Sequence, residues 1–116
     1  MPRIVEIRSY NLKPGTREEF KRILRTEARP MLARHGTDVV AAGPSLVEAD
    51  SFFIMRAYRD AADRDASQAA FYGSTAWREG PREAVLACIE NYVTIVIEAD
   101  EATIDGLRDQ AREVAA

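Results

Sequence analysis

Two short stretches, EIRSY (residues 6–10) and IMRAY (residues 54–58), repeat an Arg-x-Tyr pattern late in runs rich in β-branched and aromatic residues. Such runs predict β-strands at 4–12 and 51–59. Residues two apart on a strand point to the same face, so Arg8 shares a face with Tyr10, and Arg56 shares one with Tyr58. The fold prediction starts from these two strands.

Turn signals and hydrophobic periodicity predict the other elements. KPGT (residues 13–16) ends the first strand, and Thr16 with Glu19 predicts a capping box at the start of a helix. Pro30 is expected to kink or break that helix because proline has no amide hydrogen, and Gly36 ends it. The remaining predicted elements are a strand at 38–47 interrupted at Gly43-Pro44, a helix from Asp60 or Asp63 to about Tyr72, a short helix after Pro81, a strand at 91–99, and a last helix from about Glu101.

The predicted order is β-α-β-β-α-β with a helical tail, the split β-α-β arrangement of ferredoxin-like α+β folds. In that topology one antiparallel sheet carries helices on one face, and its first and third strands are central neighbours. The 116 residues and 47% hydrophobic content are enough for one core. We therefore expect one domain over 1–116, with a core at 3–98 and a C-terminal helical extension at 100–116.

The two faces of the predicted sheet differ in polarity. One face, which we expect the helices to cover, is apolar and carries Val5, Ile7, Phe53, Met55 and Ala57. The other face is partly charged and partly apolar and carries Glu6, Arg8, Tyr10, Phe52, Ile54, Arg56 and Tyr58. We expect Arg8 opposite Tyr58 and Tyr10 opposite Arg56. Exposed apolar residues on a mixed face usually mark an interface, so we expect a twofold homodimer in which two such faces enclose a cavity.

Guanidinium and phenol groups inside that cavity suit a small anionic or phenolic ligand. The candidate ligand-binding residues are Arg8, Tyr10, Arg56, Tyr58 and Trp77. For Trp77 the alternative is that it caps the sheet together with its aromatic neighbours in the sequence. For the arginines the alternative is that they pair with Glu6 and hold the dimer together without any ligand.

His35 is the only histidine, and it is predicted to lie at the end of the first helical region. There it is either a charge that complements the helix dipole or a general base at the mouth of the pocket. Tyr10 is the second candidate base. With one histidine and one cysteine, Cys88, we expect no metal site built from histidine or thiolate ligands, and no Gly-rich phosphate loop is present. We expect no cofactor, with a haem held by His35 as the remaining alternative.

Charge and composition limit the partners. Acidic residues (19) exceed basic ones (16), whereas a nucleic-acid-binding protein would show a clustered basic excess. No run approaches the ~20 apolar residues that span a bilayer, and the charges in the first ten residues do not fit a signal peptide. A single cysteine is typical of a reducing compartment, so we expect a cytoplasmic protein.

Glu6, Arg8, Tyr10 and Gly15 form a Glu-x-Arg-x-Tyr-x-x-x-x-Gly pattern, and two further motifs follow it along the chain. Together these motifs resemble the NIPSNAP family. VEIRSYNLKPGTREEF (residues 5–20) is similar to the opening of these proteins, whose Glu-x-Arg-x-Tyr-x-x-x-x-Gly pattern falls here on Glu6, Arg8, Tyr10 and Gly15. PMLARHG (residues 30–36) and RAYRDAADRDASQAAFYGSTAW (residues 56–77) resemble its later motifs. The resemblance runs from Ile4 to about Glu98. It departs at VVAAGPSLVEADSFF (residues 39–53), where the family commonly has a large aromatic residue and a Gly-x-Leu-Asn turn.

The resemblance implies a dimeric α/β barrel, an architecture shared with small cofactor-free monooxygenases and muconolactone-isomerase-like enzymes. We expect a small-molecule-binding homodimer of uncharacterised function. The alternative is a cofactor-independent monooxygenase or isomerase, in which His35 or Tyr10 is the base and the arginines stabilise an oxyanion. A shared fold does not transfer an activity, so whether the protein is an enzyme stays open.

Overall fold

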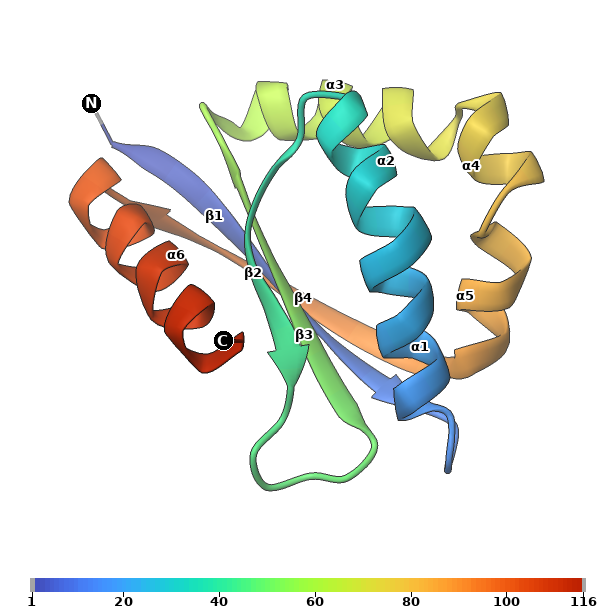
Figure 1. Cartoon of the computed structure of the whole chain (residues 1–116). Coiled ribbons are helices and arrows are strands. Elements are labelled where there is room, and N and C mark those ends of the chain that lie inside the picture. The colour runs from blue at the N-terminus through green and yellow to red at the C-terminus, as the bar shows by residue number, and fades with distance from the viewer. Residues whose placement is uncertain (1, 116) are drawn as a thin grey trace.

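The computed structural model describes residues 2–115, with side chains described as far as Ala111. Figure 1 shows a mixed α+β fold, which confirms the predicted fold class. The elements are β1 (Arg3–Leu12), α1 (Arg17–Ile23), the π-helical turn η1 (Leu24–Ala28), α2 (Arg29–Arg34), β2 (Asp38–Pro44), β3 (Ser51–Tyr58), α3 (Ala61–Tyr72), α4 (Thr75–Glu79), α5 (Arg82–Cys88), β4 (Ile89–Ala99) and α6 (Glu101–Ala115).

The four strands form one antiparallel sheet in the order β2-β3-β1-β4, so β1 and β3 are the central neighbours, as predicted. The predicted pairing of Arg8 with Tyr58, and of Tyr10 with Arg56, is wrong. The observed cross-strand pairs are Glu6–Arg56, Arg8–Ile54 and Tyr10–Phe52. The predicted register would have set Glu6 opposite Asp60, two like charges, whereas the observed one sets it opposite a guanidinium group.

Helices cover both faces of the sheet, and α1 to α5 lie on one side while α6 lies on the other (Figure 1). We expected the main layer of helices on the apolar face of the sheet. This prediction is wrong, because α1 to α5 cover the face that carries Glu6, Arg8 and Tyr10. Large aromatic residues make this mixed face the better core. The main core is formed by Tyr10, Leu12, Phe20, Ile23, Ala28, Met31, Leu32, Phe52, Ile54, Phe71, Trp77, Val85 and Cys88.

The C-terminal helix α6 covers one end of the opposite face. Ile104 of α6 is fully buried and belongs to the same cluster as Val5 and Ala57 of the central strands. The contact is reinforced by Asp38 on β2, which accepts hydrogen bonds from Arg108 (2.7 and 3.2 Å) and from Arg3 (3.2 Å). On the β4 part of this face Val93, Ile95 and Ile97 remain 66%, 59% and 41% exposed.

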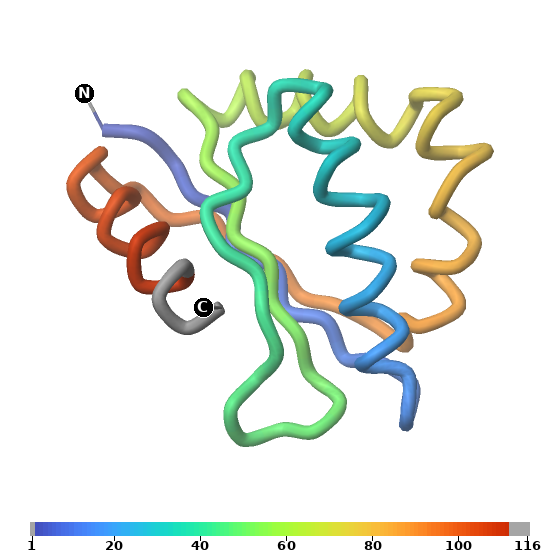
Figure 2. The backbone as a smooth tube through the Cα atoms, in the orientation of Figure 1, coloured from blue at the N-terminus to red at the C-terminus, as the bar shows by residue number. Residues whose placement is uncertain are grey.

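The helix boundaries agree with the predicted turn chemistry in most places. Asp60 caps α3, its carboxylate accepting a hydrogen bond from the Asp63 amide, and Gly36 ends α2 with a φ of +77°. The predicted capping box is wrong: the Thr16 hydroxyl donates to the carbonyls of residues 13 and 88, and Glu19 pairs with Arg22 instead. The loop between β2 and β3 extends away from the helices (Figure 2).

Pro30 changes the helix rather than ending it. The chain passes from α1 into the π-helical turn η1, where the Arg29 amide donates to the Leu24 carbonyl, and continues directly as α2. Proline lacks the amide hydrogen for a regular helical bond, and a π turn widens the helix at this point. Leu24 and Ala28 of this widened turn line the same cavity as Arg56 of β3.

Candidate ligand site

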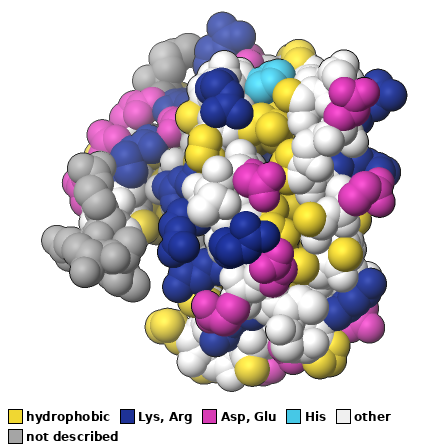
Figure 3. Space-filling model, turned by 45° about the vertical axis from the view of Figure 1, so that its right-hand side comes forward, with side chains coloured by type: hydrophobic (Ala, Val, Ile, Leu, Met, Phe, Trp, Pro, Cys, Tyr) yellow, Lys and Arg dark blue, Asp and Glu magenta, His cyan; other side chains and the backbone are white. Residues whose placement is uncertain are grey.

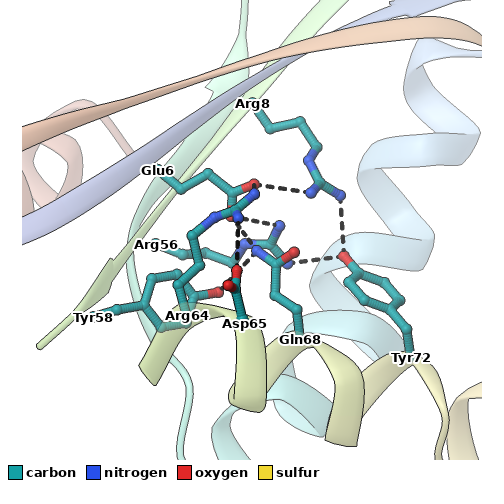
Figure 4. Close-up of polar contacts among 8 residues, drawn as sticks. All are labelled: Glu6, Arg8, Arg56, Tyr58, Arg64, Asp65, Gln68 and Tyr72. Carbon is teal, nitrogen blue, oxygen red and sulfur yellow. Dashed lines mark hydrogen bonds and ion pairs between the residues drawn. The ribbon is translucent and has the colours of Figure 1, made fainter. Parts of the chain in front are cut away.

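The site is centred on Glu6, whose side chain is fully buried in the middle of β1. Its Oε1 accepts a hydrogen bond from Arg8 Nη2 at 2.8 Å, and its Oε2 accepts one from Arg56 Nη2 at 3.0 Å (Figure 4). Arg8 lies two residues after Glu6 on β1, so both side chains point to the same face of the sheet, and Arg56 is the cross-strand neighbour of Glu6 on β3. The strand register therefore places two guanidinium groups around one carboxylate.

Helix α3 completes this polar cluster with Arg64, Gln68 and Tyr72, which are spaced four apart and so share one helix face (Figure 4). Arg64 Nη2 lies 3.3 Å from Glu6 Oε1, and the Gln68 amide donates to Glu6 Oε2. The Tyr72 phenol oxygen accepts hydrogen bonds from Arg8 Nη1 at 3.2 Å and Arg56 Nη1 at 2.8 Å. Hence α3 contributes one cation and two neutral groups to the cluster.

Positive charge exceeds negative charge in this buried cluster. The guanidinium groups of Arg8, Arg56 and Arg64 all contact Glu6, the only buried carboxylate among the described residues. Arg8 is 8% and Arg56 is 1% exposed, and Arg64 has a second, exposed partner in Asp65. The Nε atoms of all three arginines are buried without a hydrogen-bond partner. Buried charges of this kind are costly unless they are paired.

The electrostatic environment shifts the acids and bases of the cluster. Burial alone would raise the pKa of Glu6, but Arg56, Arg8 and Arg64 together hold the pKa of that carboxyl below its usual value. For Tyr10, burial, with the neighbouring Tyr72, raises the pKa to about 12 in spite of the nearby arginines. Glu6 is therefore a carboxylate at neutral pH, and Tyr10 is a protonated phenol.

A cavity lies next to the cluster, between the sheet and the helices. Arg56, Tyr10 and Tyr72 form its polar end, and Leu24 and Ala28 of the π-helical turn contribute to its apolar wall. The rest of the wall is made by Phe20, Leu32, Ile54, Phe71, Trp77 and Val85. The cavity offers about 30 Å³ to the centres of water molecules, which is room for one or two waters.

The structure brings most of the predicted ligand residues together, but inside a single chain. Tyr10, Arg56 and Trp77 line the cavity, and Arg8 reaches it through its contact with Tyr72. Tyr58 is buried outside the lining and contacts Gln68 at 3.4 Å. The predicted enclosure of the arginines between two subunits is wrong, because helix α3 of the same chain covers them. The alternative pairing with Glu6 is observed, also within one chain.

His35 lies apart from the cluster. It is the C-cap of α2 and is exposed, and the single histidine of the chain is visible at the surface in Figure 3. Its ring forms a T-shaped pair with that of Phe71, with 5.4 Å between the ring centres. His35 therefore touches a residue of the cavity wall without lining the cavity itself.

Sequence reasoning did not assign Arg64, Gln68 and Tyr72 to the site. A signal was present, because polar residues at i, i+4 and i+8 form one stripe on the alanine-rich helix α3. A polar stripe on a helix predicted to cover a sheet indicates polar partners on that sheet. Within the described part of the chain, no group of histidine, cysteine or acidic side chains is arranged to hold a metal, and no helix is long and apolar enough to cross a membrane.

The fold and the cluster define a small α+β protein with a buried arginine-rich polar site. The chain belongs to the NIPSNAP family, whose model matches residues 5–98. This confirms the resemblance found in the sequence. No functionally curated protein matches the sequence.

Solved structures with the same fold include proteins from bacteria and from an archaeon. A NIPSNAP family protein from Agrobacterium tumefaciens is 17% identical, with a TM-score of 0.78 and coverage of 85% of this chain and 87% of its own. An uncharacterized NIPSNAP-like domain protein from Burkholderia xenovorans is 18% identical, with a TM-score of 0.78 and coverage of 85% and 86%. A conserved protein from Methanosarcina mazei is 15% identical, with a TM-score of 0.63 and coverage of 86% and 95%. Identities this low show the fold alone.

Proposed function

We propose that the protein is a small-molecule-binding homodimer whose ligand places an anionic or phenolic oxygen at Arg8 and Arg56. The excess of buried guanidinium groups over buried carboxylates carries this proposal. A ligand oxygen supplies the negative charge that Glu6 alone does not provide for its arginines. Charge-assisted hydrogen bonds from arginine to such an oxygen are among the stronger polar contacts in proteins.

The cavity accounts for the rest of the ligand. Its wall is mostly apolar and aromatic, with polar groups confined to the end at Arg56, Tyr10 and Tyr72. Because its pKa is raised to about 12, Tyr10 stays protonated and serves as a hydrogen-bond donor. An apolar body with one anionic oxygen fits this division, which is the usual composition of a small-molecule site. The proposal requires no metal or organic cofactor.

The alternative enzymatic function, a cofactor-independent monooxygenase or isomerase, requires a base near the ligand. A phenol with a pKa of about 12 does not supply one at neutral pH, so Tyr10 suits a donor role better. His35 is the remaining candidate, and its ring is separated from the cavity by Phe71. Of the two functions, binding is therefore better supported by the positions of these residues.

The dimer is proposed on the sheet face opposite the arginines. Val93, Ile95 and Ile97 of β4 form an exposed apolar row on this face, beside the partly buried Ile7 of β1. An exposed apolar row on an edge strand usually marks an interface. A second copy related by twofold symmetry would cover the row with its own identical row. In this arrangement each subunit keeps its own ligand site.

Thermal unfolding with matched probes tests the ligand proposal. Benzoate and benzamide have the same ring, and only benzoate is anionic. We expect benzoate to raise the melting temperature of the wild type and of Arg34→Gln, which changes an exposed arginine on α2. Arg8→Gln, still folded by circular dichroism, should lose the stabilisation. Benzamide should leave all three proteins unchanged. Stabilisation of Arg8→Gln equal to that of the wild type would place the anion elsewhere and overturn the assignment.

A further inference from the structure

We propose that Tyr72 is a gate for the ligand site: its phenol oxygen occupies the position between Arg8 and Arg56 that the ligand oxygen takes, and it leaves when the ligand binds. This inference rests on the proposed function. It adds a residue that moves and a chemical class for the ligand.

The first argument is the geometry of the donors. Arg8 Nη1 and Arg56 Nη1 converge on one oxygen, that of Tyr72, at 3.2 and 2.8 Å (Figure 4). The other Nη of each arginine is engaged by Glu6. The two Nη1 groups are therefore the donors directed at the cavity side, and a neutral phenol oxygen is a weaker acceptor for them than an ionised oxygen. The position is suited to an anion but is filled by an internal neutral group.

The second argument is volume. The cavity of about 30 Å³ has room only for water, whereas an apolar protein cavity that binds benzene measures roughly 150 Å³. A side chain of the wall must therefore move for an aromatic ligand to enter. Removal of the Tyr72 ring from the wall would free both the space of one ring and the two arginine donors.

The third argument is the position of Tyr72 in the chain. Tyr72 is the last residue of α3 and is half-buried, whereas Arg56 and Tyr10 lie on the central strands and are buried. Among the residues at the polar end of the cavity, Tyr72 can swing outward with the least disturbance of the sheet.

The vacated space defines the ligand. The Tyr72 ring packs edge-on against Phe71 and Trp77, with ring centres 5.1 and 5.4 Å apart and interplanar angles of 84° and 82°. The guanidinium carbons of Arg8 and Arg56 lie 5.9 and 5.8 Å from the centre of the same ring. A flat aromatic ring with an ionised oxygen reproduces these contacts and adds the charge. The ligand class is therefore an aryl compound with an ionised oxygen, either a phenolate or an aryl carboxylate.

Binding of para-nitrophenolate and benzoate to wild type and Tyr72→Phe tests the gate. Calorimetric titration at a pH at which para-nitrophenol is ionised gives the affinity for each probe. Tyr72→Phe keeps the ring but removes the internal acceptor, so the ligand no longer competes with it for the two arginines. We expect at least about tenfold tighter binding, the equivalent of one charged hydrogen bond. Comparison of the two probes distinguishes a phenolate from a carboxylate ligand.

The matched control is Tyr92→Phe, which removes a phenol oxygen from another tyrosine near Arg8. The Tyr92 ring lies under the Arg8 guanidinium at 4.7 Å, and its hydroxyl forms no hydrogen bond to either arginine among the described residues. We expect the affinity of Tyr92→Phe for both probes to equal that of the wild type. A gain in both variants would reflect general loosening of the site and would overturn the gate.

Fluorine NMR of the wild type, labelled with fluorotyrosine at its four tyrosines, is a second test. It does not depend on whether a protein substituted at Tyr72 folds. The resonance of Tyr72 is identified as the one that remains unassigned after Tyr10→Phe, Tyr58→Phe and Tyr92→Phe. We expect saturating benzoate to move it toward the position of a solvent-exposed fluorotyrosine. A resonance that stays in place, or equal or weaker binding in Tyr72→Phe, would overturn the gate.

The proposed function can survive failure of the gate. If the wild type binds the probes and Arg8→Gln does not, the proposed function is still supported. Absence of binding in the wild type and in every variant would overturn the gate and the proposed function together.

Discussion

Glu6 on β1 and Arg56 on β3 are direct cross-strand neighbours, and their side chains form an ion pair of 3.0 Å that is almost completely shielded from solvent. The pair fixes the position of the Arg56 guanidinium beside the cavity. The register of the two central strands, the stability of the fold and the geometry of the proposed site therefore depend on the same contact.

Replacement of Glu6 by glutamine should destabilise the protein strongly. The variant keeps the shape of the side chain but leaves the guanidinium groups of Arg8 and Arg56 without a buried counter-charge. Removal of one partner of a buried ion pair costs about 3–5 kcal/mol. Chemical denaturation, with unfolding followed by circular dichroism, measures the change in the free energy of unfolding.

Glu19→Gln is the matched control for this substitution. Glu19 pairs with Arg22 on the exposed surface of α1, where ion pairs contribute little to stability. We expect its unfolding midpoint to stay close to that of the wild type. Equal effects of the two substitutions would mean that the Glu6 cluster is not the buried centre described here.

Acid stability should depend on Glu6. Its folded-state pKa lies below the unfolded value of 4.5, so its contribution to stability is present above that pH and is lost as the pH falls through the folded pKa. Wild-type stability should therefore decrease below about pH 4.5, whereas Glu6→Gln should start lower and lose less over the same range. Thermal melts across an acid pH series provide the comparison, and parallel curves for the two proteins would refute the linkage.

Alkaline stability should depend on Tyr10. Its pKa is raised from 10.0 to about 12 in the folded protein, so the unfolded chain releases this proton first. The contribution of Tyr10 is complete below pH 10 and is lost as the pH rises to about 12. Tyr10→Phe should weaken the decline in melting temperature over that interval. An unchanged slope would show that Tyr10 titrates normally.

Ile95→Lys should disrupt the proposed dimer. The substitution places a charge in the centre of the exposed apolar row on β4, where a second copy would have to bury it. Light scattering after size-exclusion chromatography should give a dimer mass for the wild type and a monomer mass for the variant. Leu46→Lys, at the 96% exposed tip of the β2–β3 loop, is the control that should remain dimeric. A monomeric wild type would eliminate the dimer proposal.

Local patterns in the sequence predicted much of the fold. Alternation of residues located the central strands, one of the two predicted caps, Asp60, begins α3, and Gly36 marked the end of α2. These features depend on neighbouring residues, which the sequence displays directly. The strand pairing and the choice of sheet face depend on contacts between distant segments. Charged residues such as Glu6 suggested a face covered by a second subunit, although two of the partners of Glu6 lie about sixty residues away on α3 of the same chain.

Only part of the candidate site was predicted, because the rest of it depends on contacts between distant segments. Arg8 and Arg56 were found because the Arg-x-Tyr pattern repeats on the two strands. Tyr72 and Gln68 were missed because their role depends on how α3 packs across the sheet. The π-helical turn that lines the cavity was also not predicted, since Pro30 indicated a break or kink without specifying its form.

A crystal structure with para-bromobenzoate tests the central claim most directly, because the anomalous signal of bromine locates the ligand independently of its surroundings. The account predicts a bromine peak among the apolar residues of the cavity, with the carboxylate within hydrogen-bonding distance of Arg8 and Arg56. A peak found only at the protein surface, with both guanidinium groups still bonded as they are in the free protein, would contradict it.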